Sequence, residues 1–313
     1  MRQGGRRGAR RRLGGAVATL IAILVAAGSS LTMSPATAQA DSASAPKSAA
    51  KADFTAGEII SDDNFFNYES MTLSGVQHFL ASVDCVPRDD SPCLSDYSER
   101  TRSVKASPGR CTAYSGRRSE SAASIVWRVA QTCKVNPEVL LVLVQKEQSL
   151  LTHPSASGYQ KATGYACPDT APCNARYYGF FNQVYAAAWQ FREYTLHPHE
   201  WRYRIGHVTV AYNPSTACGS REIDIRNQAT ANLYNYTPYQ PDAQTIAHPD
   251  GPAGSCSSYG NLNFSRLYRH WFGDPLTVTF GGWAPACLNF VGGRDCAAGN
   301  PFDLIPATAY GTD

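Results

Sequence analysis

A run of six apolar residues, Val139–Val144 (VLLVLV), is the strongest constraint on how this chain can fold. It follows Asn136, Pro137 and Glu138, which suit the cap, the first turn and the positive dipole end of a helix. Because β-branched residues are frequent in the run, a buried strand is the alternative, but the Asn-Pro-Glu start favours a helix. A helix that is apolar on every side must be surrounded by other elements. We therefore predict a mainly helical fold around a buried helix at Pro137–Gln148.

Other segments can supply helices that cover this one. Ser119–Cys133 has apolar residues at the i, i+3, i+4 spacing of an amphipathic helix, and Phe181–Arg192 carries a similar stripe. Met71–Leu80, with Thr72 as its cap, predicts a shorter helix. Asn261–Trp271 predicts a helix or a strand.

Composition divides the chain into five parts. Residues 1–40 are predicted to be an export signal and 41–52 a flexible linker. Residues 53–118 form an N-terminal helical segment, and 119–275 the main domain. Residues 276–313, rich in glycine and proline and with two cysteines, are expected to form a small non-catalytic appendage.

The export signal rests on the order of its regions. Six arginines and no acidic residue precede nineteen uncharged residues, Leu13–Leu31, and Ala-x-Ala steps then end at Ala40. An uncleaved anchor is the alternative, since nineteen residues can just span a bilayer. Glycine and polar residues within the segment favour cleavage after Ala40. We expect a secreted mature chain with no later membrane span.

The charge balance argues against nucleic acid as a partner. The chain has 28 basic and 25 acidic residues, but six of the bases lie in the predicted signal. The remaining 22 bases are outnumbered by acids, so the mature chain lacks the positive surface that a phosphate backbone requires.

The ten cysteines all follow the predicted signal, and an even number in an exported chain indicates disulfides. Pairing between neighbours along the chain is the simplest arrangement, with Cys167–Cys173 and Cys287–Cys296 favoured because their loops are short. Cysteine spacing gives no zinc pattern, and His197–Glu200 (HPHE) is better explained as a loop. We predict no metal, no cofactor and no thiol nucleophile.

Glu147 continues one face of the buried helix, because it lies three, four and seven residues after Val144, Leu143 and Leu140. Apolar surroundings and the negative end of the helix dipole both disfavour its charged form. A carboxyl group that keeps its proton can protonate a glycosidic oxygen, so Glu147 is a candidate general acid. The alternative is a solvated glutamate on a frayed last turn.

Three segments resemble lytic transglycosylases and goose-type lysozymes. Val135–Leu151 (VNPEVLLVLVQKEQSLL) is similar to their "V-D-P-x-L-L-L-A-x-x-x-x-E-S" pattern, with Glu147 on the catalytic glutamate. Tyr178–Gln183 (YGFFNQ) resembles the "G-L-M-Q" segment, and Ala211–Asn213 the "A-Y-N" segment, in the same order. The resemblance covers about residues 119–239. It departs from the family at Gln148, where a serine is usual, and at Asn182, where the glutamine falls one position late.

The resemblance implies a lysozyme-like α+β fold with disulfide-bonded loops, and a bacterial enzyme that cleaves the β-1,4 glycan backbone of peptidoglycan. It also implies substrate contacts from the matching segments. Pyranose rings stack on aromatic faces, so the aromatic members are expected to line a cleft. The implied substrate-binding residues are Tyr178, Phe181, Asn182, Gln183, Tyr212 and Asn213.

Asp169 decides between two chemistries. A transglycosylase needs one catalytic acid, whereas a hydrolase needs a second carboxylate to activate water. Asp169, inside the Cys167–Cys173 loop, is the tentative second carboxylate if it faces Glu147 across the cleft. Pro168-Asp169-Thr170 also has the composition of a turn, in which the aspartate would bond to its own backbone.

Two functions from other classes stay open. The chain can be a non-catalytic glycan-binding or adhesin-like surface protein, because a fold does not fix a function. A cell-wall peptidase is weaker, since no metal or nucleophile pattern is present. Our preferred reading is a monomeric glycosidase, secreted or attached to the cell wall, with peptidoglycan as its partner.

Overall fold

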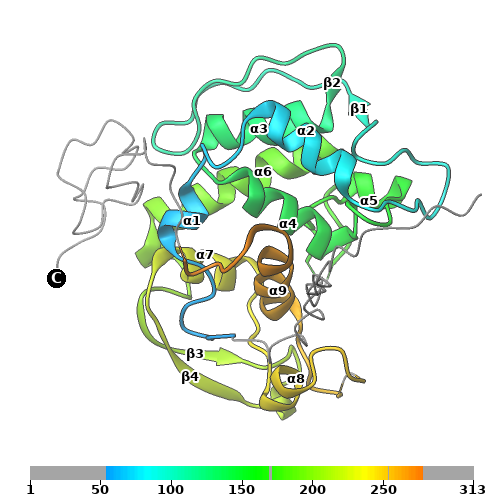
Figure 1. Cartoon of the computed structure of the whole chain (residues 1–313). Coiled ribbons are helices and arrows are strands. Elements are labelled where there is room, and N and C mark those ends of the chain that lie inside the picture. Colours follow the sequence, from blue (N-terminus) through cyan, green and yellow to red (C-terminus); the bar gives the residue numbers. More distant parts are fainter. Residues whose placement is uncertain (1–53, 169–170, 253, 278–313) are drawn as a thin grey trace, which may run out of the picture. The chain divides into compact units, whose positions relative to one another are not determined.

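The computed structural model describes residues 54–168, 171–252 and 254–277. These residues are mainly helical, with two short antiparallel strand pairs (Figure 1). The elements in chain order are α1 (Asp62–Phe66), α2 (Leu73–Ser82), β1 (Ser98–Glu99), β2 (Glu120–Ser121), α3 (Ala122–Cys133), α4 (Pro137–Gln148), α5 (Ala156–Gln160), η1 (Ala175–Tyr177), α6 (Phe180–Leu196), η2 (Pro198–Glu200), β3 (Gly206–Ala211), η3 (Thr216–Cys218), β4 (Ser220–Ile225), α7 (Gln228–Tyr236), α8 (Ala243–Ala247) and α9 (Gly260–Phe272).

Helix α4 is the buried helix that the sequence predicts, and it packs against α3, α6 and α9 (Figure 1). All six residues of Val139–Val144 are completely buried. Asn136 caps the helix by accepting a hydrogen bond from the Glu138 N–H at 2.7 Å, and Ser149 ends it in the left-handed conformation. The alternative of a buried strand is therefore wrong. Burying each valine or leucine contributes about 1.5–3 kcal/mol, so α4 is a main source of stability.

The other predicted helices form with shifted ends. Thr72 caps α2 through the Gly75 N–H at 3.0 Å, as expected, and the ambiguous Asn261–Trp271 segment lies within α9. Helix α3 begins at Ala122, three residues later than the predicted Ser119–Cys133 helix. The difference arises because Glu120 and Ser121 pair as β2 with β1.

Residues 54–118 share one hydrophobic core with the rest of the described chain, through buried side chains such as Ile59, Phe65 and Tyr114. The buried carboxylate of Glu120 connects this segment to α3 through hydrogen bonds. Glu120 accepts hydrogen bonds from Thr101 at 2.6 Å, Tyr114 at 3.0 Å and Ser124 at 2.7 Å, and it also pairs with Arg128. Burial alone would raise the pKa of Glu120, but these hydrogen bonds outweigh it and lower the pKa.

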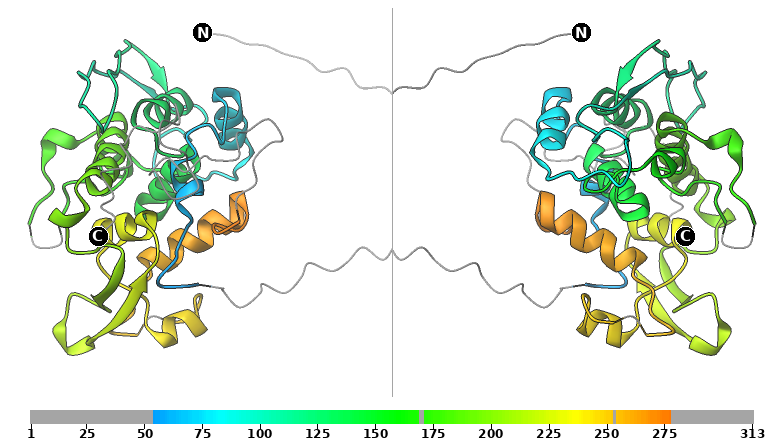
Figure 2. Two further views of the ribbon diagram at one scale, coloured as in Figure 1. Left: turned by 90° about the vertical axis from the view of Figure 1, so that its left-hand side faces the viewer. Right: turned by 90° about the vertical axis from the view of Figure 1, so that its right-hand side faces the viewer.

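Strands β3 and β4 form a hairpin that the sequence analysis did not predict. Val208 pairs with Ile223, and Val210, Ile223 and Ile225 are buried while most other side chains of the hairpin are not. Figure 2 shows this hairpin in yellow-green at the lower edge of the described residues. The sequence feature that indicates this hairpin is the alternation of apolar and polar residues in HVTV and REIDI, on either side of Asn-Pro-Ser.

The described residues contain four disulfides, each between neighbouring cysteines along the chain. The predicted Cys167–Cys173 bond is among them. The others are Cys85–Cys93, Cys111–Cys133 and Cys218–Cys256. The predicted Cys287–Cys296 bond lies outside the described residues, as do the signal, the linker and residues 278–313. Across the described ranges, no helix has both the length and the apolar character needed to cross a membrane.

Asp62 makes stability depend on pH. Its carboxylate accepts hydrogen bonds from the Ala229 and Gln228 N–H groups at the start of α7, yet burial raises its pKa from 3.8 to about 6. With the folded-state pKa above the unfolded value, its contribution is full below pH 3.8 and is lost as the pH rises through about 6. We expect Asp62 to lower the free energy of unfolding by about 1.4 kcal/mol between pH 5 and pH 8.

Urea denaturation at the two pH values checks this expectation. Asp62→Asn keeps an oxygen that can accept from Ala229 but does not titrate, so the difference between pH 5 and pH 8 should shrink by that amount. An unchanged difference in the variant would assign the pH dependence to other groups.

Candidate active site around Glu147

Glu147 lies on the last turn of α4, with its side chain 24% exposed. Its carboxylate contacts the ammonium group of Lys146, whose side chain is only 5% exposed. The same ammonium donates a hydrogen bond to the Thr237 hydroxyl at 2.9 Å. The surroundings of Glu147 thus include a buried cation, and not only the apolar groups that the helix pattern implied.

A loop at residues 161–165 forms a second side of this site. Gly164 has φ +68°, and a Cβ atom there would lie 3.2 Å from Glu147 Oε2. The loop backbone therefore approaches the carboxylate closely at a position that favours glycine. Tyr236, on α7, donates a hydrogen bond to the Thr163 carbonyl at 2.8 Å. Burial, and then the charge of Glu147, raise the pKa of Tyr236 well above its ordinary value, so it remains a donor.

Gln183 fixes the conformation of that loop. Its side chain is completely buried, and its amide oxygen accepts from the Thr163 N–H at 3.2 Å and the Tyr165 N–H at 3.0 Å. Its amide nitrogen donates to the carbonyls of Tyr165 at 3.0 Å and Tyr177 at 2.9 Å. Gln183, predicted as a substrate contact, therefore uses both atoms of its side-chain amide to hold the backbone of this loop and of Tyr177.

The other side chains of the Tyr178–Gln183 segment differ in how far they are buried. Phe181 is 2% exposed and packs against Tyr114, with 4.8 Å between ring centroids, so its ring offers almost no surface to a ligand. Asn182 donates to the Tyr178 carbonyl at 2.9 Å and accepts from Arg102 at 2.9 Å. Tyr178 is half-buried, which leaves part of its ring accessible.

Tyr212 and Asn213 directly follow the end of β3. Asn213 accepts a hydrogen bond from the Ser215 N–H at 3.0 Å, as in an Asx turn. Tyr212 lines a depression of about 450 Å³ together with residues 54–57 and β4. The backbone connects this segment to the Glu147 site. Ala211 forms a β-bridge with Tyr239, two residues after Thr237, and the Thr237 hydroxyl accepts a hydrogen bond from Lys146.

Asp169, the tentative second carboxylate, lies outside the described residues. In the His197–Glu200 segment, His197 caps the end of α6 and contacts Arg110, and Pro198–Glu200 forms the 3₁₀ turn η2. In the part of the chain that the structure describes, no three His, Cys, Asp or Glu residues are grouped as a metal site would require.

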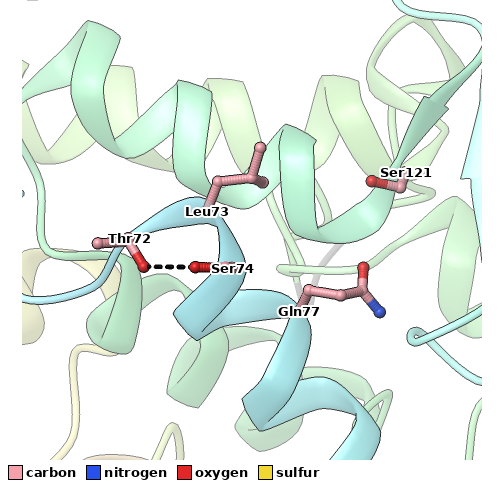
Figure 3. A pocket seen from close by; sticks show the side chains of 5 residues that line it. All are labelled: Thr72, Leu73, Ser74, Gln77 and Ser121. Atoms are coloured by element: carbon pink, nitrogen blue, oxygen red, sulfur yellow. Dashed lines mark hydrogen bonds between the residues drawn. The ribbon is translucent and has the colours of Figure 1, made fainter.

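Two further depressions lie on the described surface. One, of about 550 Å³, surrounds the start of α2 and is lined by Thr72, Leu73, Ser74, Gln77 and Ser121 (Figure 3). These side chains include no titratable group, so we do not regard it as a reaction site. The other, of about 410 Å³, lies between the end of α4 and α9 and includes Lys146.

Sequence reasoning located Glu147 but missed the groups that surround it, namely Lys146, Gly164, Tyr236 and Thr237. Lys146 is adjacent in sequence, yet successive helix residues lie on different faces. Thr237 comes from a position 91 residues later, and nothing in the local pattern marks it. The assembled site is a partly exposed carboxylate beside a buried ammonium, and such a group can accept or donate a proton to a bound molecule.

Comparisons with known proteins add no identification. No protein-family model, curated protein or solved structure matches the chain.

Proposed function

We propose that this protein is a secreted, lysozyme-like enzyme that cleaves the β-1,4 glycan backbone of peptidoglycan, with Glu147 as its single general acid and base. One observation carries the proposal. Two segments that resemble the lytic transglycosylase pattern, Val135–Leu151 and Tyr178–Gln183, converge on one carboxylate, because Gln183 holds the loop whose Gly164 lies close to Glu147. Such convergence is the support that the geometry adds to the resemblance.

The proposed reaction has two steps at Glu147. The carboxyl group first gives its proton to the glycosidic oxygen, so that the bond to C1 breaks and the leaving sugar departs as an alcohol. The carboxylate then takes the proton of the C6 hydroxyl as that oxygen bonds to C1, which forms a 1,6-anhydro sugar. Lys146 stabilises the carboxylate between the two steps, since its ammonium contacts it directly.

Product masses test this mechanism. Wild-type protein acting on purified peptidoglycan is expected to release products with the mass of an intact disaccharide less one water, and Asp169→Asn is expected to keep most of the activity. If the products are reducing sugars, and Asp169→Asn is as inactive as Glu147→Gln, then Asp169 activates water and the protein is a two-carboxylate hydrolase.

A non-catalytic glycan-binding or adhesin-like protein is the second candidate. It is favoured by the contacts of the Glu147 carboxylate, which already pairs with the buried ammonium of Lys146 and lies close to Gly164. Under this alternative, wild type would bind insoluble peptidoglycan and release no fragments from it.

The proposed location outside the cytoplasm makes a separate prediction. We expect the secreted protein to begin at Asp41 and to contain no free thiol, in keeping with the four disulfides of the described residues. Mass analysis without reduction measures both properties. A mature chain that retains residues 1–40, or several reduced cysteines, would contradict export through a cleaved signal.

A further inference from the structure

Residues 98–121, from the start of β1 to the end of β2, fold back on themselves along the top of the view in Figure 1. Beyond the β1–β2 pairing, the two halves are joined where the Thr101 N–H donates to the Arg117 carbonyl at 2.9 Å and where Val104 pairs with Tyr114. A disulfide also connects the segment to α3. This segment, which we call the basic ribbon, is therefore fixed in one shape before anything binds to it.

The charges of the basic ribbon are strongly biased. It has six basic and two acidic residues, whereas the other described residues hold 13 bases and 17 acids. Both acids are occupied, because the Glu120 side chain has no exposed surface and Glu99 accepts from the Tyr97 hydroxyl at 2.9 Å and from the Phe181 N–H. The exposed charge of the ribbon is thus positive, although the charge balance of the whole mature chain predicts no such surface.

Five of the six cations are exposed, and most of their donors are unused. Three of the side chains make no hydrogen bond or ion pair with any residue that the structure describes, namely those of Arg100, Lys105 and Arg118. Arg102 uses one of its five N–H donors, on Asn182 at 2.9 Å. Arg117 is 55% exposed, and its contacts to Ser124 at 3.3 Å and to Glu120 at 3.9 Å are long.

Four arginines are grouped around one hydrogen-bonded pair of residues. Arg100 and Arg102 flank Thr101 on one strand, and Arg117 and Arg118 lie on the facing strand. Facing strands are about 4.8 Å apart, so guanidinium groups from both strands can reach the same bound chain. All of the ribbon is described, and it exposes no large apolar side chain. It therefore lacks the apolar anchor of a membrane-surface segment and the stacking surface that nucleic-acid bases use.

We propose that the basic ribbon binds a linear phosphodiester polymer that carries no bases. A repeated charge along a chain suits cations that are spread along a ribbon. A tetrahedral phosphate accepts from guanidinium forks on two sides, whereas one fork already satisfies a planar carboxylate. This surface is separate from Glu147, and the inference does not rest on the proposed reaction. Because Arg102 bonds to Asn182, next to Gln183, a polymer bound here lies beside the start of α6.

Binding of a glycerol phosphate polymer to the full secreted chain tests the proposal, with calorimetry at several salt concentrations. Four arginines on phosphates predict that log K falls with log salt with a slope of about −3. Arg100→Gln with Arg118→Gln removes two of these contacts and no contact to a described side chain. We expect this pair to weaken binding by at least about tenfold at about 0.1 M salt and to reduce the slope to about −1.5, with unchanged urea denaturation.

The matched control is Arg88→Gln with Arg204→Gln, which removes two exposed arginines outside the ribbon. Affinity and slope should stay as in wild type. No loss in the ribbon variant, or an equal loss in the control, would overturn the proposal.

Three other anions test which partner the ribbon prefers. They are polyglutamate with the same number of charges, vesicles of phosphatidylglycerol and a single-stranded oligonucleotide. We expect each to bind more weakly than the glycerol phosphate polymer. Equal or tighter binding of any of them would assign the ribbon to that class of partner and overturn the proposal. A protein that binds the polymer and cleaves no peptidoglycan contradicts the proposed enzyme and not this inference.

Discussion

Replacing Glu147 with glutamine is expected to lower the rate of peptidoglycan cleavage by at least about 100-fold, the usual contribution of a general acid. Glutamine keeps the size of the side chain and can still accept a hydrogen bond from Lys146, but it has no proton to transfer. Release of soluble fragments from purified peptidoglycan measures the effect.

A control must separate this chemical loss from a loss of folding. Glu147 pairs with the buried ammonium of Lys146, so the loss of its charge is expected to lower the free energy of unfolding as well, and cleavage is therefore compared under conditions where urea denaturation shows Glu147→Gln to be folded. Glu222→Gln removes a carboxylate of the β3–β4 hairpin that is 64% exposed, and it should change neither rate nor stability. Undiminished cleavage by Glu147→Gln would remove Glu147 from the mechanism.

Helix α4 could be predicted residue by residue because its signals are local. Asn136 and Pro137 mark its start, and the apolar run decides its burial, so the predicted and observed bounds coincide. The start of α3 could not be predicted in the same way. Its first expected turn is taken by the pairing of β2 with β1, which comes from 21 residues or more earlier in the chain. Such pairing depends on tertiary contacts that propensity does not contain.

In the candidate site too, local sequence signals predicted one part and tertiary contacts decided the other. The helix pattern and the family resemblance both point to Glu147 as a candidate, but neither predicts which groups contact its side chain. That is decided by residues such as Gly164 and Thr237, which approach from other elements. The resemblance also located the Tyr178–Gln183 segment without its orientation. On α6, Phe181 and Gln183 are buried, so this segment contributes to the core and to the wall of the site more than to an open cleft.

The role of Gln183 makes it the position where a substitution should damage folding and the site together. Gln183→Leu replaces the amide with an apolar group of similar size. It leaves the N–H groups of Thr163 and Tyr165, and the carbonyls of Tyr165 and Tyr177, without their partner. Each unsatisfied buried group costs about 1–3 kcal/mol, so we expect the free energy of unfolding to fall by about 4 kcal/mol or more.

Gln190→Leu is the matched control, because Gln190 lies on the same helix and is 9% exposed. Its amide accepts a long hydrogen bond of 3.4 Å from the Tyr165 hydroxyl and bonds to no backbone group among the described residues. We expect it to lose about 1 kcal/mol in urea denaturation. Equal losses in the two variants would mean that the loop at residues 161–165 does not depend on Gln183. A larger loss in Gln183→Leu, together with lost cleavage under conditions where the variant stays folded, would show that the shape of this loop is what keeps Glu147 active.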